Sequence, residues 1–143
     1  MEGLFKTKLL AVQEAIKPIK KDSENPFFKS MYFDINSILA EIKPILNSHN
    51  ILLTQKLTTL EGGKMGLKTT LYDTGSDEVL ESECPLPENP DPQKMGSIIT
   101  YFRRYALQSL LALEAEDDDA NQATGQKAPE LMKKKITSND EPF

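Results

Sequence analysis

The sequence has very little cysteine and histidine, and each shortage excludes a class of site. A single cysteine, Cys84, excludes an internal disulfide framework. Because His49 is the only histidine, no Cys/His zinc cluster can form and a catalytic triad has just one candidate base. The glycine-rich residues 62–66 lack the upstream glycine and the hydroxyl residue of a phosphate-binding P-loop. We therefore interpret Cys84 as a small packed residue, His49 as a polar residue at a helix end and residues 62–66 as a turn.

Long apolar runs are also missing. The longest uninterrupted run is only a few residues, which is too short to span a bilayer. The N-terminal residues 1–6 lack the basic region, apolar stretch and cleavage site of a signal peptide. At 143 residues the chain is about one domain long, since domains usually have roughly 100–200 residues. These features predict a cytoplasmic protein with one folded domain.

Charge is distributed unevenly along the chain. The net charge is −5, but residues 1–68 carry +3, whereas residues 69–113 and residues 114–143 each carry −4. The distribution of charge matters more for binding a polyanion than its sum does. The basic first half therefore permits contact with nucleic acid, although charge alone does not demonstrate it.

Apolar residues at helical spacing predict three helices. The first covers residues 4–17 and ends at Pro18, and the second covers residues 35–46. Pro44 lies inside the second stripe and predicts a kink or an early stop. The third helix covers residues 93–113. Its predicted buried stripe is Ile99, Phe102, Ala106, Leu110 and Leu113, with Ser97, Thr100, Arg104 and Gln108 on the opposite face.

Between the second and third helices the period of the pattern changes from 3.6 to 2. Residues 51–58, 67–72 and 78–84 alternate between apolar and polar and are separated by turn residues, which predicts an antiparallel three-stranded meander. The expected fold class is therefore α+β, a meander packed with flanking helices. We expect residues 1–119 to form the domain and residues 120–143 to form a flexible acidic tail.

Two segments interleave aromatic residues with cations, residues 27–32 and residues 100–105. Proteins hold single-stranded nucleic acid by cations along the phosphates and by rings on which bases stack, at about 1–3 kcal/mol per base. In the alternative interpretation, the aromatic residues belong to the core and Arg103 and Arg104 pair with the acidic run that follows the helix. The residues alone leave both interpretations open.

The acidic run after the third helix consists of Glu116, Asp117, Asp118 and Asp119. Negative charge at a helix C-terminus opposes the helix dipole, so something must offset it. Solvation, ion pairing with this or another subunit, and a divalent cation such as Mg²⁺ would each serve. A metal-dependent nuclease is accordingly one alternative function, although we expect no cofactor.

A longer spaced pattern resembles a known family. It is carried by residues 25–30, 42–46, 91–93, 96–107 and 116–119, together with Tyr32, Asp34, Asn36, Leu110 and Leu111. Together these resemble the ERF (essential recombination function) family of bacteriophage single-strand annealing proteins, over about residues 5–121. Phe102 departs from the pattern, where many relatives have a small residue, and the chain is short for the family.

The resemblance implies a function without bond-making chemistry. Such proteins anneal complementary single strands of DNA without ATP in phage homologous recombination and repair, in the bacterial host cytoplasm, as a homo-oligomeric ring or filament. The implied β-β-β-α core is similar to that of the eukaryotic strand-annealing recombination mediator. Besides a nuclease, the alternative is a module that coats single strands without speeding their pairing.

The implied DNA contacts can be divided by chemistry. Phosphates would be contacted by Arg103, Arg104, Lys29, Lys20, Lys21 and Lys56. Tyr32, Tyr101 and Tyr105 would stack on bases or pack, and Ser97 and Thr100 would lie on the same surface.

The last residues carry a second resemblance. Asp140, Glu141, Pro142 and Phe143 are similar to the acidic Pro-Phe tip of bacterial single-stranded DNA-binding proteins. In that family the tip docks into basic pockets of replication and repair proteins, a form of C-terminal capture. The hypothesis is a tip that recruits such partners, and the alternative is an ordinary acidic tail.

Overall fold

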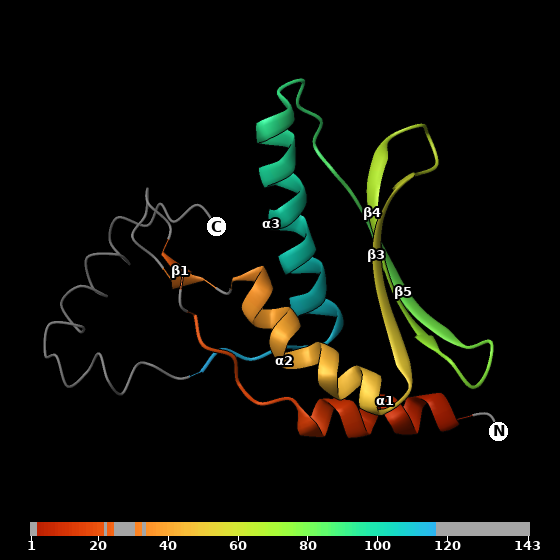
Figure 1. Ribbon diagram of the computed structural model, residues 1–143. Helices are drawn as coiled ribbons and strands as arrows, with labels where there is room; N and C mark the ends of the chain where they lie inside the picture. Colours follow the sequence, from red (N-terminus) through yellow and green to blue (C-terminus); the bar gives the residue numbers. More distant parts are fainter. Residues whose placement is uncertain (1–2, 22, 25–30, 33, 117–143) are drawn as a thin grey trace, which may run out of the picture.

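The computed structural model describes residues 3–21, 23–24, 31–32 and 34–116 (Figure 1). The elements in chain order are α1 (Leu4–Ala15), β1 (Ser23–Glu24), β2 (Met31–Tyr32), α2 (Ile35–Ser48), β3 (Ile51–Thr59), β4 (Met65–Asp73), β5 (Val79–Pro85) and α3 (Pro92–Leu110). The fold is α+β, and the predicted antiparallel meander is confirmed by the strand order β3-β4-β5. None of the described helices is long and apolar enough to cross a membrane.

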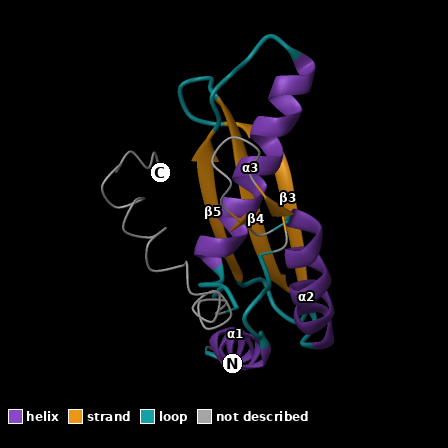
Figure 2. Cartoon of the chain, turned by 90° about the vertical axis from the view of Figure 1, so that its left-hand side faces the viewer, coloured by secondary structure: helices purple, strands orange, loops and turns teal. Residues whose placement is uncertain are grey.

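The meander has one covered face and one open face. Leu53, Leu71 and Leu80 lie side by side in the register of the three strands and contribute to the core. The helix α3 crosses this face, which we call the inner face (Figure 2). No described element covers the other face, the outer face, in either view (Figures 1 and 2). Because successive side chains of a strand point to opposite faces, every second side chain lies on the inner face with α3 and the others face solvent on the outer face.

Helix α2 supplies more of the buried apolar residues than any other helix or strand. It begins at Asp34, whose carboxylate accepts a hydrogen bond from the backbone N–H of Asn36 at 3.1 Å. The helix continues through Pro44 to Ser48, so the predicted early stop is wrong. Pro44 and Ala40 are both exposed, so the Ala40 carbonyl that loses its partner can bind water instead. Burial of the apolar stripe offsets the cost of the proline.

Helix α3 begins at Pro92, one residue before its predicted start, and ends at Leu110, three residues before its predicted end. Asp91 accepts a hydrogen bond from the backbone N–H of Gln93 at 3.0 Å, and Pro92 occupies the first turn. The predicted buried stripe is only partly correct: Leu110 and Leu113 pack against the core, but the fully buried residue of α3 is Leu107. The stripe residues predicted to be buried, Ile99, Phe102, Ala106 and Leu110, are half-buried. The first part of α3 extends past the core, so no other described element packs against the side that faces away from the sheet.

The segment after α1 and the segment after α3 meet beside the core. The backbone N–H of Ile19 donates to the carbonyl of Glu114, and the N–H of Glu116 donates to the carbonyl of Ile19, both at 2.8 Å. These bonds form a parallel bridge between Ile19 and Ala115. The short strands β1 and β2 also pair antiparallel, and the sequence analysis predicted neither of them.

Helix α1 is fixed to the meander by one charged contact. Lys8 donates to Asp73 at 2.7 Å, and the Asp73 side chain is 2% exposed. Asp73 also accepts hydrogen bonds from the Ser76 hydroxyl at 2.8 Å and the Gly75 N–H at 3.2 Å. This carboxylate therefore ties α1 to the turn between β4 and β5.

Candidate nucleic-acid interface

The candidate interface is the part of α3 that extends past the core, residues 92–105, which we call the projecting segment. No residue of this segment is buried, and Tyr105 is 44% exposed. In Figure 1 the segment rises away from α1 and α2. Its side chains are therefore held on a rigid helix while they remain accessible.

Three side chains of the projecting segment form a compact group, the α3 cluster of Tyr101, Arg104 and Tyr105. The centroids of the two tyrosine rings are 4.6 Å apart. The guanidinium carbon of Arg104 lies 5.3 Å from the Tyr101 centroid and 5.5 Å from the Tyr105 centroid. Residues three and four apart share a helix face, which explains why these side chains meet. Cation–π attraction stabilises such an arrangement.

The surroundings of Tyr101 in the α3 cluster favour its neutral phenol. Hydrogen bonding with Tyr105 raises the pKa of Tyr101, burial raises it further, and Arg104 partly opposes both effects. A neutral ring beside a cation can present a flat surface without adding negative charge. The cluster therefore combines one positive charge with two aromatic faces.

Arg103 lies in a different environment from its neighbour. Successive helix residues are about 100° apart, so Arg103 points to the inner face of the sheet and not to the α3 cluster. Its Nε donates to Oε1 of Gln55 at 3.4 Å, and Nε2 of Gln55 donates to the Arg103 carbonyl at 3.2 Å. Within the part of the chain that the structure describes, Arg103 forms no ion pair.

The sequence pattern predicted a functional role neither for Gln55 nor for its second hydrogen-bond partner, Thr69. Its Nε2 also donates to the hydroxyl of Thr69 at 3.0 Å, and Thr69 is fully buried. One signal was present, because Gln55 interrupts the apolar series Ile51, Leu53 and Leu57 on the inner face. A polar residue at such a position usually has a buried hydrogen-bond partner.

The other predicted residues of α3 lie on the projecting segment. Ser97 is exposed, and its hydroxyl donates to the Gln93 carbonyl at 3.3 Å. Thr100 is half-buried. The structure thus places Ser97, Thr100 and both arginines on one helical segment.

The predicted lysines and Tyr32 do not form one group with the arginines. Lys56 is exposed on the outer face, because it alternates with Gln55 on β3. Lys20 is exposed and Lys21 is half-buried, and both follow Ile19 in the connector after α1. Lys29 lies outside the described residues. Tyr32 lies in β2, but its side chain is not among those described.

The outer face of the sheet is balanced in charge near Lys56. Lys68 lies directly opposite Lys56 in the register and forms ion pairs with Glu81 at 3.0 Å and Glu83 at 3.9 Å. The hydrogen bond from Lys68 to Glu81 raises the lysine pKa. This face therefore does not present a continuous row of cations around Lys56.

The structure also describes the surroundings of several other residues that the sequence suggested as candidates for catalysis or metal binding. His49 follows α2, and its Nδ1 lies 2.8 Å from the carbonyl of Ile45. Cys84 is half-buried on the inner face, and burial raises the pKa of its thiol. Glu116 is exposed, whereas Asp117, Asp118 and Asp119 lie outside the described residues, as do Asp140, Glu141, Pro142 and Phe143. Among described side chains no group of three His, Cys, Asp or Glu could hold a metal ion.

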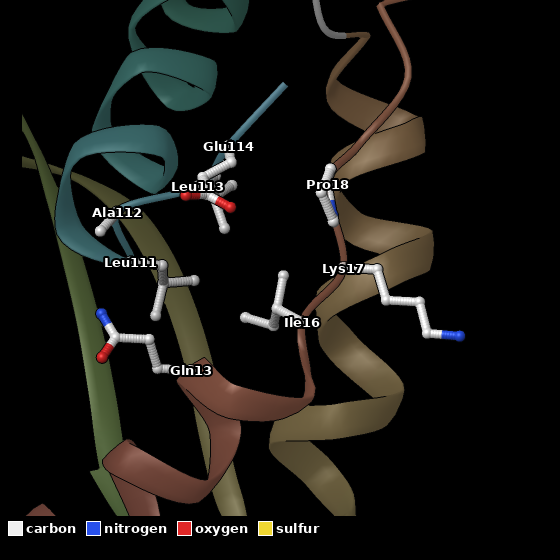
Figure 3. Close-up of a pocket in the computed structure, with 8 residues that line it drawn as sticks. All are labelled: Gln13, Ile16, Lys17, Pro18, Leu111, Ala112, Leu113 and Glu114. Carbon is white, nitrogen blue, oxygen red and sulfur yellow. The ribbon is translucent and has the colours of Figure 1, made fainter. Parts of the chain in front are cut away.

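A hollow of about 250 Å³ lies between the end of α1 and the segment after α3 (Figure 3). Its lining residues are Gln13, Ile16, Lys17, Pro18, Leu111, Ala112, Leu113 and Glu114. Ile16 and Leu111 point toward each other across it in Figure 3. One cation and one carboxylate at such a hollow give no net attraction for a polyanion, so it is not the candidate interface.

Comparison with known proteins gives one match. A family model described as the ERF superfamily matches residues 5–142. No curated protein and no solved structure matches the chain. The match includes α3 with both arginines and extends beyond the described residues into the C-terminal segment.

Proposed function

The chain belongs to the ERF superfamily, and on that premise we propose that it binds single-stranded DNA and anneals complementary strands without hydrolysing a nucleotide. The family resemblance predicted from the sequence is confirmed by the match over residues 5–142. At the level of the family, membership supports a role in phage recombination by single-strand annealing.

The projecting segment of α3 supports the proposal because it combines the two kinds of group that single strands need. Arg103 and Arg104 supply two permanent charges on adjacent residues, directed to different sides of the helix. Tyr101 and Tyr105 supply aromatic surface next to Arg104. Cations bind phosphates and rings stack on bases whatever the sequence of the strand. A protein that must accept any strand needs contacts of this kind.

In the proposed mechanism no covalent bond is made or broken. One strand lies along the projecting segment, and its phosphates displace counterions when they contact the arginines. Unpaired bases stack near Tyr101 and Tyr105 and remain available to a second strand. Base pairing then supplies the sequence specificity. Several copies in a homo-oligomer would hold successive segments of the strand and multiply weak contacts through effective concentration. This chemistry would take place in the cytoplasm of the bacterial host.

The test is the rate of duplex formation between two complementary labelled oligonucleotides, with EDTA present and no nucleotide. We expect clear acceleration at low salt, where phosphate contacts are strongest, and loss of the acceleration as salt rises. A non-complementary pair is the control and should show no duplex signal.

The same samples distinguish the alternatives. Binding of single strands without faster pairing would contradict annealing and support a coating module. Shortening of the labelled strand when Mg²⁺ replaces EDTA would support a nuclease. Absence of both binding and acceleration would contradict the proposed function altogether.

A further inference from the structure

We propose that Gln55 is a positioning residue for DNA binding, which orients the Arg103 guanidinium so that its terminal nitrogens face a phosphate. This inference rests on the proposed function, because it assigns a role within the same interface. It concerns a residue of β3 that acts through Arg103 and does not itself contact DNA.

The geometry of the Gln55 amide carries the proposal. Both of its polar atoms are engaged: Oε1 accepts from Nε of Arg103 at 3.4 Å, while Nε2 donates to the Arg103 carbonyl at 3.2 Å and to Thr69 Oγ1 at 3.0 Å. Thr69 is fully buried in the central strand β4, so it provides a fixed point. The amide is therefore held by the sheet and in turn holds both the backbone and the side chain of Arg103.

The particular nitrogen that Gln55 contacts is informative. An arginine has five N–H donors, and the contact to Gln55 uses the one on Nε. The two terminal NH₂ groups can bind a phosphate in a bidentate manner, end on, without the help of Nε. A bond at Nε fixes the plane of the guanidinium without using those donors. Gln55 thus reduces the freedom of Arg103 before DNA arrives, which favours binding.

A neutral amide suits this role better than a carboxylate. Glutamate at position 55 would have nearly the same shape but would form a full ion pair with Arg103. That charge would compete with the phosphate for the same cation. The chemistry therefore predicts that Gln55→Glu acts on DNA binding through Arg103, even though residue 55 lies on the sheet.

The experiment measures the affinity of the full chain for a fluorescent oligothymidine at several salt concentrations. For Gln55→Glu we expect weaker binding. The slope of log K against log[salt] should become less negative by about 0.7, the contribution of one phosphate contact on a single strand. Gln13→Glu is the matched control, because it makes the same amide-to-carboxylate change on the exposed side of α1. We expect its slope to equal that of the wild type.

A second pair of variants separates positioning from folding. Arg103→Ala should make the slope less negative by the same amount of about 0.7. In that background Gln55→Glu should have no further effect, because the group it acts on is gone. Thr69→Val keeps the shape of the buried residue and removes the hydroxyl that holds the amide. It should weaken binding less than Gln55→Glu does and leave the slope unchanged, since Arg103 keeps its charge.

Three results would overturn the inference. The first is a Gln55→Glu slope equal to that of Gln13→Glu in protein that remains folded by circular dichroism. The second is an equal loss of affinity from Gln55→Glu with and without Arg103. If Gln55→Glu does not fold, wild-type affinity in Thr69→Val is the third. In these cases the wild type still binds DNA and the proposed function stands, whereas absence of wild-type binding would remove both.

Discussion

The two ends of α3 are built from the same helix but have opposite surroundings. Leu107 is fully buried, and Leu111, just after the helix, is 8% exposed, because this end packs against the sheet and lies beside α2 (Figure 2). In the projecting segment no residue is buried, and Tyr105 is 44% exposed. The comparison teaches that one end supplies the stability that the other end needs to keep arginines and tyrosines in place while they remain accessible.

The first prediction separates the two ends by stability. Leu107→Ala removes a side chain with no solvent exposure and should lower the free energy of unfolding by about 2–5 kcal/mol. Tyr105→Ala should lower it by less than about 1 kcal/mol, because its ring is partly solvated. Urea denaturation of both variants measures the difference. Equal losses would show that α3 is not divided in this way.

The second prediction separates the ends by DNA affinity. Tyr105→Ala should weaken binding of a single strand by about 1–3 kcal/mol if one base stacks there. Tyr105→Phe keeps the ring and should retain most of the affinity. Fluorescence anisotropy at constant salt measures both. A loss in Tyr105→Phe as large as that in Tyr105→Ala would assign the effect to the hydroxyl and contradict stacking.

The third prediction concerns the far side of the core, where α1 is tied to the meander. The hydrogen bond from Lys8, followed by that from Ser76, lowers the pKa of Asp73 in the folded protein. The stabilising effect is therefore present above the unfolded pKa of about 3.9 and is lost as pH falls through the lower folded value. Asp73→Asn should be less stable than the wild type at pH 7, by less than the loss in Leu107→Ala. Below about pH 4 the difference should shrink.

Thermal unfolding of both proteins across that range of pH tests the linkage. A stability difference that stays constant from neutral to acidic pH would show that the Asp73 charge does not contribute. DNA binding at pH 7 should be unchanged in Asp73→Asn, because this contact lies away from the projecting segment.

Local features of this fold could be predicted from the sequence. The alternation in residues 51–58 and 67–72 identified two strands within two residues of their observed ends. The periodicity of apolar residues placed the start of α3 at residue 93, one residue after the observed start at Pro92. Periodicity is informative wherever an element has one face fully buried.

Features that depend on tertiary contacts could not be predicted in the same way. The buried side of α3 was partly misplaced because a charged residue, Arg103, lies on the side that faces the sheet, and a charge on a helix does not indicate such a position. Its contact with Gln55 depends on the position of β3 relative to α3, which no local pattern records. Pro44 was predicted to kink or end α2, but packing of the apolar stripe carries the helix through. Two-residue strands such as β1 are too short to leave a pattern.

The central claim is that the arginines of the projecting segment drive annealing. The most direct measurement is the annealing rate of Arg103→Ala/Arg104→Ala beside the wild type, in EDTA and without nucleotide. The account predicts that the double variant pairs the strands at the rate seen without protein. Its free energy of unfolding should stay within about 1 kcal/mol of the wild type. Annealing at the wild-type rate by the folded double variant would contradict the account.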